Sequence, residues 1–133
     1  MEKPDLVYGD IKYRNQQRIY SRFSIPTLLH NTIHHQGAFY HSRLFTSFRY
    51  NTFYSIAADY ELNLKIYLDN KYKVIKSKGI ISLCRNDGIS HVESSKSHAE
   101  MNGVRKKYIS GLLNHICKLM LGLKVFLKDI YRS

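Results

Sequence analysis

The segment from Ala57 to Asp69 (AADYELNLKIYLD) gives the clearest secondary-structure signal in this chain of 133 residues. Its apolar side chains favour one arc, and we expect an amphipathic helix. Two acids, Asp59 and Glu61, stand in the first turn. A helix turns about 100° per residue, so the two carboxylates point about 200° apart and cannot work as a catalytic pair.

The two acids therefore have different expected roles. Glu61, Lys65 and Asp69 follow one another at intervals of four, which predicts a solvent-facing stripe of alternating charge. Asp59 points in the direction of the apolar side chains, near the helix N-terminus, whose free N–H groups favour a carboxylate. Such a carboxylate either satisfies nearby backbone donors or lines a cavity, and helix geometry leaves both roles open.

Length and charge narrow the class of protein. A chain of 133 residues corresponds to one domain. Its formal net charge of +11 favours anionic partners, which include nucleic acid, phosphorylated small molecules and an anionic membrane surface. We expect no secretory signal, no membrane span and, from two distant cysteines, no disulfide framework. The expected protein is soluble or lies on a surface, in a reducing compartment.

The first half of the chain predicts short elements. Residues 5–13 predict a strand that enters a turn at Gly9–Asp10, and the polar residues 14–24 predict a loop. Pro26 stands where a short helix could start. Residues 38–48 (AFYHSRLFTSF) predict a strand that passes into a helical turn.

The second half predicts a hairpin and a helix. Residues 71–85 contain two short β-like runs, which we interpret as a β-hairpin with its turn at Ser77–Gly79. Residues 94–130 predict a long helix with apolar residues at intervals of three and four. Its end is rich in lysine, and it either packs on the domain or lies in a membrane interface as a basic amphipathic helix.

Two further patterns admit several interpretations. His30, His34, His35 and His41 are potential metal ligands, but they lack the H-E-x-x-H pattern, so polar contacts in a cleft or simple exposure explain them as well. The runs YRNQQRIYSRF and FTSFRYNTFY alternate aromatic and basic residues, as surfaces that stack on single-stranded nucleic acid do. Tyrosine also packs well in strands and binds sugars, and no nucleic-acid module accompanies these runs.

Four segments occur in an order that resembles a known family. DLVYGDI, IHHQGAFYHSRLF, FYSIAADYELNLKIYL and CRNDGIS resemble the second, acceptor-side half of the catalytic domain of family 2 glycosyltransferases with the GT-A fold. The resemblance is strongest to bacterial enzymes that build surface polysaccharides, and it covers about residues 5–110. It implies an α/β fold: a partial GT-A domain with a short mixed sheet, a β-hairpin and C-terminal helices.

The resemblance also implies roles for particular residues. The acid that opens the Asp-Tyr-Glu helix acts as the general base, so Asp59 would deprotonate a hydroxyl of the acceptor sugar. The matching positions for binding the donor or the acceptor are His35, Gln36, Arg43, Gly88, Ile89 and Ser90.

The match is incomplete at the N-terminal side. Family members carry a nucleotide-binding half upstream, with an Asp-x-Asp motif that holds a divalent cation (Mg²⁺ or Mn²⁺). This chain begins almost at DLVYGD and contains no Asp-x-Asp. We therefore expect a truncated or split transferase that binds no metal or other cofactor itself, with independent activity doubtful and an upstream polypeptide as a candidate partner.

The resulting expectation has two parts. Residues 1–95 would form the acceptor-side half of a glycosyltransferase that moves a sugar from a nucleotide-sugar to a glycan or lipid-linked acceptor. Residues 96–133 would form a basic amphipathic helical tail of a cytoplasmic protein, peripheral at the inner membrane face. The alternative is a non-enzymatic basic module that binds single-stranded nucleic acid or an anionic membrane.

Overall fold

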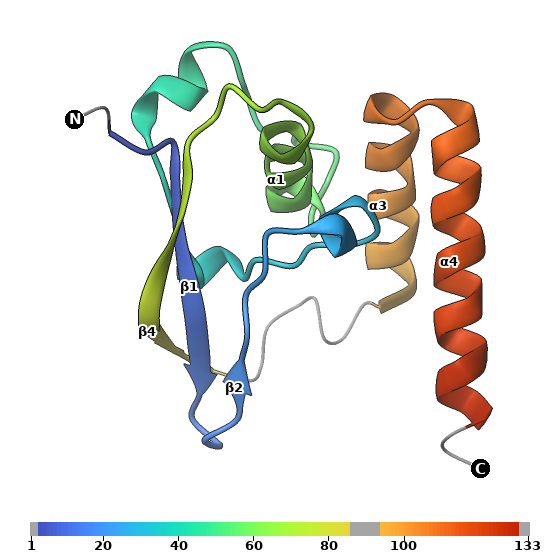
Figure 1. The fold of residues 1–133 in the computed structure, drawn as a ribbon, viewed down its shortest axis with the longest axis horizontal. Helices are drawn as coiled ribbons and strands as arrows, with labels where there is room; N and C mark the ends of the chain where they lie inside the picture. The colour runs from blue at the N-terminus through green and yellow to red at the C-terminus, as the bar shows by residue number, and fades with distance from the viewer. Residues whose placement is uncertain (1–2, 86–93, 131–133) are drawn as a thin grey trace.

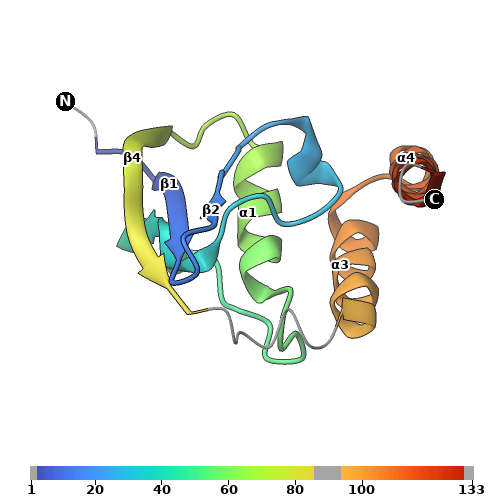
Figure 2. The same ribbon diagram turned by 90° about the horizontal axis from the view of Figure 1, so that it is seen from below.

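The computed structural model describes residues 3–85 and 94–130 and is a mixed α/β structure. A sheet, the helix α1 and a pair of C-terminal helices follow one another across the molecule, as Figures 1 and 2 show. The strands are β1 (Leu6–Tyr13), β2 (Arg18–Ile19), β3 (Ala38–Tyr40) and β4 (Val74–Cys84). The helices are α1 (Ala58–Leu68), α3 (Ser94–Tyr108) and α4 (Gly111–Ile130), with short 3₁₀ turns η1 (Ile25–Leu28), η2 (His35–Gly37) and η3 (Ser42–Thr46).

Strand β1 is the centre of the sheet. It pairs in parallel with β4 and antiparallel with β2 and β3, so the sheet is mixed. Val7 lies opposite both Phe39 and Ile75, and directly opposed residues share one face of a sheet. The parallel and antiparallel pairing of β1 confirms the expected α/β class with a short mixed sheet.

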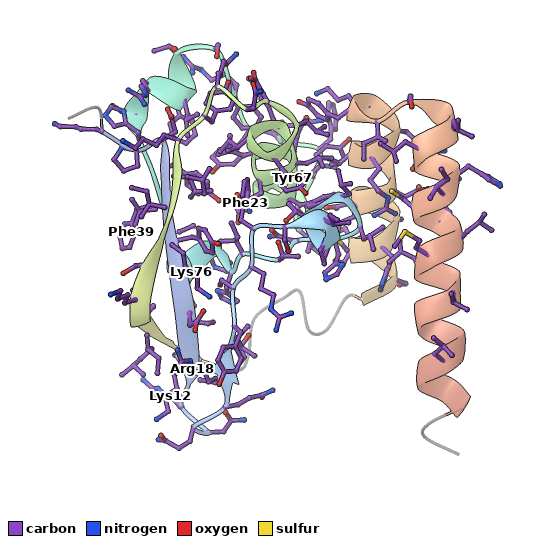
Figure 3. All side chains as sticks on the ribbon, viewed as in Figure 1. Lys12, Arg18, Phe23, Phe39, Tyr67 and Lys76 are labelled. Atoms are coloured by element: carbon purple, nitrogen blue, oxygen red, sulfur yellow. The ribbon has the colours of Figure 1, made fainter. Side chains whose placement is uncertain are left out.

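The two faces of the sheet differ in their cover. Leu6 and Tyr8 on one face pack with Leu62 and Ile66 of α1 in the main core. On the other face Phe39 is 63% exposed and Ile75 is 43% exposed. Figure 3 shows Phe39 on the side of the strands away from α1. The described residues thus cover one face of the sheet and leave apolar side chains on the other.

Helix α1 is enclosed on two sides. Leu62 and Ile66 face the sheet, while Tyr60 and Leu64 form a second core with Val104 of α3. Figure 2 shows α1 between the sheet and α3. The helix expected over residues 57–69 is confirmed, and its observed ends differ from the expected ones by one residue each.

The expected solvent-facing stripe on α1 is wrong. Glu61 is only 1% exposed, and its Oε1 accepts hydrogen bonds from Lys107 Nζ (2.7 Å) and Tyr108 Oη (3.0 Å), both on α3. Asp69 pairs instead with Lys71, at 2.7 Å. The reason is the packing of α3 on the side of α1 that amphipathic patterning assigns to water.

The expected turn at Gly9–Asp10 is also wrong, because β1 runs through both residues. The chain turns after Tyr13, where Gln16 takes a positive φ of 73°. Asp10 is buried, and its carboxylate accepts hydrogen bonds from Arg18 and from the backbone N–H of Ser21 and forms an ion pair with Lys76 (3.1 Å). Charged partners on β2 and β4 therefore make an acid tolerable inside this strand.

The expected hairpin in residues 71–85 is replaced by one long strand. Strand β4 continues through Ser77–Gly79 and pairs in parallel with β1, with register shifts at Asp10. Gly79 has a φ of +83°, in the left-handed region that glycine enters without strain. Irregular strands and hairpin turns both use such a glycine, so the local sequence does not distinguish them.

The C-terminal helix of the expectation is two helices. The α-helical path ends at Tyr108 and restarts at Gly111, and the two helices run side by side in opposite directions. Ile109 between them is buried. The division of the chain at residue 95 stays a prediction, although α3 shares a core with α1. Within the described residues, none of the helices has the length and apolarity to cross a bilayer.

The short expected elements are largely confirmed. The 3₁₀ turn η1 has Pro26 in its first positions, with Ser24 as its N-cap. Strand β3 leads into η3, as expected for residues 38–48. The expected loop at 14–24 is irregular except for β2.

Candidate functional site

The candidate site surrounds Asp59, the second residue of α1. The residue is half-buried, between the open solvent and the core. Two tyrosines from other segments lie within its electrostatic reach: Tyr40 at the end of β3 and Tyr50 in the segment that follows η3. One helix, one strand and one loop thus bring an acid and two phenols together.

A buried polar chain continues from this cluster along α1. Asn63 follows Asp59 by one helical turn and is fully buried. Its Oδ1 accepts a hydrogen bond from Tyr40 Oη at 2.8 Å, and its Nδ2 donates to Asn31 Oδ1 at 2.9 Å. Because both groups of the Asn63 amide are satisfied, this chain holds the ring of Tyr40 in one position beside Asp59.

The tyrosines stay protonated over the physiological range. Burial, and then the charge of Asp59 and a hydrogen bond to it, raise the pKa of the Tyr50 hydroxyl to about 12. Burial and the charge of Asp59 also raise the pKa of Tyr40. The cluster therefore offers one proton acceptor, the carboxylate of Asp59, and two hydroxyls, those of Tyr40 and Tyr50, that can hydrogen-bond a ligand. This combination suits removal of a proton from a hydroxyl.

The start of α1 is capped by a residue other than Asp59. Glu100, on α3, accepts hydrogen bonds from the backbone N–H groups of Ser55 (3.2 Å), Ile56 (2.9 Å) and Ala57 (2.9 Å). Burial alone would raise the pKa of Glu100, but these hydrogen bonds outweigh it and keep the pKa below its ordinary value of 4.5. Of the two roles open to Asp59, the capping role therefore belongs to Glu100.

His35 and Gln36 lie in the exposed 3₁₀ turn η2. The ring of His35 stacks on the ring of His34 at 4.7 Å, and the backbone N–H of Gln36 donates to His34 Nδ1 at 3.3 Å. His34 Nε2 lies 3.5 Å from the hydroxyl of Tyr13, the last residue of β1. These two expected binding residues thus lie toward the C-terminal end of β1.

Arg43 lies at the other end of β1. Its guanidinium makes a two-pronged ion pair with Asp5, with Nε at 2.6 Å from Oδ1 and Nη2 at 2.9 Å from Oδ2. Hydrogen bonds from Arg43 hold the pKa of Asp5 below its usual range. An eight-residue strand is about 25 Å long, so Arg43 and His35 are not brought together. Gly88, Ile89 and Ser90 lie outside the described residues.

A pocket of about 460 Å³ lies beside Arg43. Its other lining residues include Asp5, Ser47, Lys71 and Tyr72. The cations in this wall are already engaged, because Arg43 pairs with Asp5 and Lys71 pairs with Asp69. The two cations that line the pocket are therefore less able to bind a phosphate than unpaired cations would be, and the pocket is a weak candidate for a phosphate site.

Two of the histidines serve the local backbone. The side chains of His34 and His41 accept hydrogen bonds from the N–H groups at the starts of η2 and η3. Among the described residues, no group of three or more possible metal ligands comes together.

The site contains residues that sequence reasoning did not single out: Tyr40, Tyr50, Asn63 and Asn31. Only Asn63 carried a local signal, because it stands four residues after Asp59 on the same helix. The other three come from separate loops or strands. A scan against protein-family models and searches of curated proteins and of solved structures find no match to the chain.

Proposed function

We propose that this chain is the acceptor-side part of a GT-A glycosyltransferase of family 2, which transfers a sugar from a nucleotide-sugar to a glycan or lipid-linked acceptor. The observation that carries the proposal is the half-buried residue Asp59, with its carboxylate close enough to the neutral hydroxyls of Tyr40 and Tyr50 to act on them electrostatically. The protein would act at the cytoplasmic side of a membrane.

In the proposed reaction Asp59 accepts the proton of an acceptor hydroxyl while that oxygen attacks the anomeric carbon of the donor sugar. The new glycosidic bond forms as the bond to the nucleoside diphosphate breaks. The two tyrosine hydroxyls would orient the acceptor by hydrogen bonds. A neutral hydroxyl is a weak nucleophile, so loss of the base would lower the turnover rate about 10²–10⁴-fold.

A second polypeptide would hold the nucleotide and its divalent cation. The uncovered sheet face with Val7, Phe39 and Ile75 supports this part of the proposal, since exposed apolar patches mark interaction sites. Strands β3 and β4, which in the described residues pair only with β1, offer two open edges for further strands.

The test joins this chain to a donor-binding half with an Asp-x-Asp motif and measures release of nucleoside diphosphate. Asp59→Asn keeps the shape of the side chain and removes the base, and we expect turnover to fall about 100-fold or more. Asp69→Asn, at the C-cap of the same helix and ten residues after Asp59, is the matched control and should leave turnover unchanged. Turnover by Asp59→Asn within twofold of the unmutated fusion would refute the role of Asp59, and inactivity of every fusion would count against the transferase itself.

A nucleic-acid module remains the second candidate, on one observation. The guanidinium of Arg18 lies 4.8 Å from the ring centre of Tyr20, which is 61% exposed, and Figure 3 shows Lys12 and Lys76 near the same strands. However, Asp10 already engages Arg18 and Lys76. Binding of single-stranded DNA that weakens steeply between about 50 and 200 mM salt would favour this candidate over the transferase.

A further inference from the structure

The helix α4 carries an apolar stripe that the rest of the described chain does not cover. Leu119 is 62% exposed and Leu123 is 58% exposed, although both lie on a regular helix. Figures 1 and 2 place α4 at the outer edge of the molecule, on the far side of α3 from the sheet. Among the side chains of α4 that the structure describes, the exposed large apolar ones are Leu112, Leu113, Ile116, Leu119, Met120, Leu123 and Leu127.

These seven residues occupy one side of the helix. At 100° per residue, their positions fall within an arc of about 120°, the width of a typical apolar face. Asn114 and Cys117 are buried and belong to a different arc. The helix therefore already contacts the domain through one side, and the apolar stripe is a second, outward side.

The charges of α4 indicate what kind of surface this stripe meets. Helix α4 contains three lysines and one acid, Asp129, in its last turn. Lys118 is exposed; it follows the buried Asn114 by one helical turn and lies on the opposite side of the helix from the stripe. A lysine-bearing helix with a broad apolar face is the pattern of helices that lie in the interface of anionic membranes.

Charge also argues against the other occupants of the stripe. Two copies of the chain packed through α4 would bring together two molecules that each carry a net charge of +11. Anionic lipid head groups would instead neutralise the lysines of α4. A crossing orientation does not fit, because the helix lacks the apolarity of a membrane span within its described residues.

We propose that α4 lies flat on an anionic lipid surface, with the stripe from Leu112 to Leu127 in contact with the acyl chains and its lysines among the lipid phosphates. A helix of 20 residues is about 30 Å long, so it can rest along the surface over its whole length. This inference does not depend on the sugar-transfer proposal, because it uses no residue of the Asp59 site.

The test measures binding of the full chain to lipid vesicles by flotation. Vesicles of phosphatidylcholine with about 30 mol % phosphatidylglycerol should bind the chain at least about tenfold more tightly than pure phosphatidylcholine vesicles. The double variant Leu119→Gln/Leu123→Gln keeps the charge and the helix propensity, and its binding to the anionic vesicles should fall at least about tenfold.

The matched control is Leu68→Gln/Leu83→Gln, which changes two exposed leucines outside α4 and should bind as the unmutated chain does. Equal flotation of the two double variants, or equal binding to neutral and anionic vesicles, would overturn the proposal. Self-association in sedimentation that only the α4 variant abolishes would also overturn it, and would assign the stripe to a second copy of the chain. Far-ultraviolet circular dichroism verifies that each variant is folded.

Discussion

Glu100 should be a large single contributor to the attachment of α3 to α1. Its two carboxylate oxygens accept four hydrogen bonds, from the N–H groups of Ser55, Ile56 and Ala57 and from the Ser55 hydroxyl at 3.0 Å. Loss of a helix cap costs about 1 kcal/mol, and charge-assisted hydrogen bonds cost more. Water can replace part of the loss at this partly exposed site. We expect Glu100→Ala to lower the free energy of unfolding by about 2 kcal/mol and Glu100→Gln by about 1 kcal/mol.

These losses correspond to decreases in melting temperature of roughly 8 °C and 4 °C for a chain of this size. Thermal and urea unfolding followed by circular dichroism would measure them. Asp69→Asn is the control, because asparagine can still accept the hydrogen bond that Lys71 N–H donates to residue 69 (3.2 Å). A free energy of unfolding for Glu100→Ala within about 0.5 kcal/mol of the unmutated value would refute the assigned role.

The contribution of Glu100 should depend on pH in a defined direction. Its pKa is lower in the folded chain than the ordinary value of 4.5, so the unfolded chain binds more protons in acid. The stabilisation is therefore complete above the unfolded pKa and is lost as the pH falls through the folded pKa. The stability gap between the unmutated chain and Glu100→Gln should shrink below about pH 4.5. A gap that stays constant down to about pH 3 would contradict the reasoning.

Two further substitutions test the packing around α1 and β1. Lys107→Met removes the cation beside the buried Glu61 and should lower the free energy of unfolding by about 2 kcal/mol, less than for a fully buried pair because Lys107 is half exposed. Adding Glu61→Gln to this variant should restore part of the loss, as measured by urea unfolding, and no recovery would contradict the ion pair. Gly37→Ala would bring a Cβ to 2.9 Å from the carbonyl oxygen of Gly9 and should destabilise the chain, whereas Gly122→Ala meets nothing within 4 Å and should raise the melting temperature.

The elements that the sequence predicted correctly are those with a local cause. Helix α1 was predicted from the spacing of its apolar residues along one short segment, and η1 follows from Ser24 and Pro26 at its start. The strand before η3 follows from the aromatic residues of AFY. In each case neighbouring residues determine the conformation, so no distant contact is needed to predict it.

The errors arose where a distant segment decides the outcome. Asp10 looks like a turn residue, but Arg18 and Lys76 from two other strands hold it inside β1. Gly79 suits a hairpin, but pairing of β4 with β1 across more than 60 residues keeps the strand continuous. Both contacts are long-range, and no local pattern encodes them.

The same distinction explains what could be predicted of the site. The helix period predicted that Asp59 and Glu61 point in different directions, and the structure does give them separate surroundings. Asp59 lies near Tyr40 and Tyr50, and Glu61 pairs with Lys107 of α3. The assignment of Glu61 to water failed because patterning assumes that a helix has one buried side. Helix α1 has two, since α3 covers it opposite the sheet. A glutamate buried in such a helix is tolerated only with a charged partner, and Lys107 of α3 is that partner for Glu61. Because this ion pair joins α3 to the helix that carries Asp59, α3 is part of the structure that holds the Asp59 site in place.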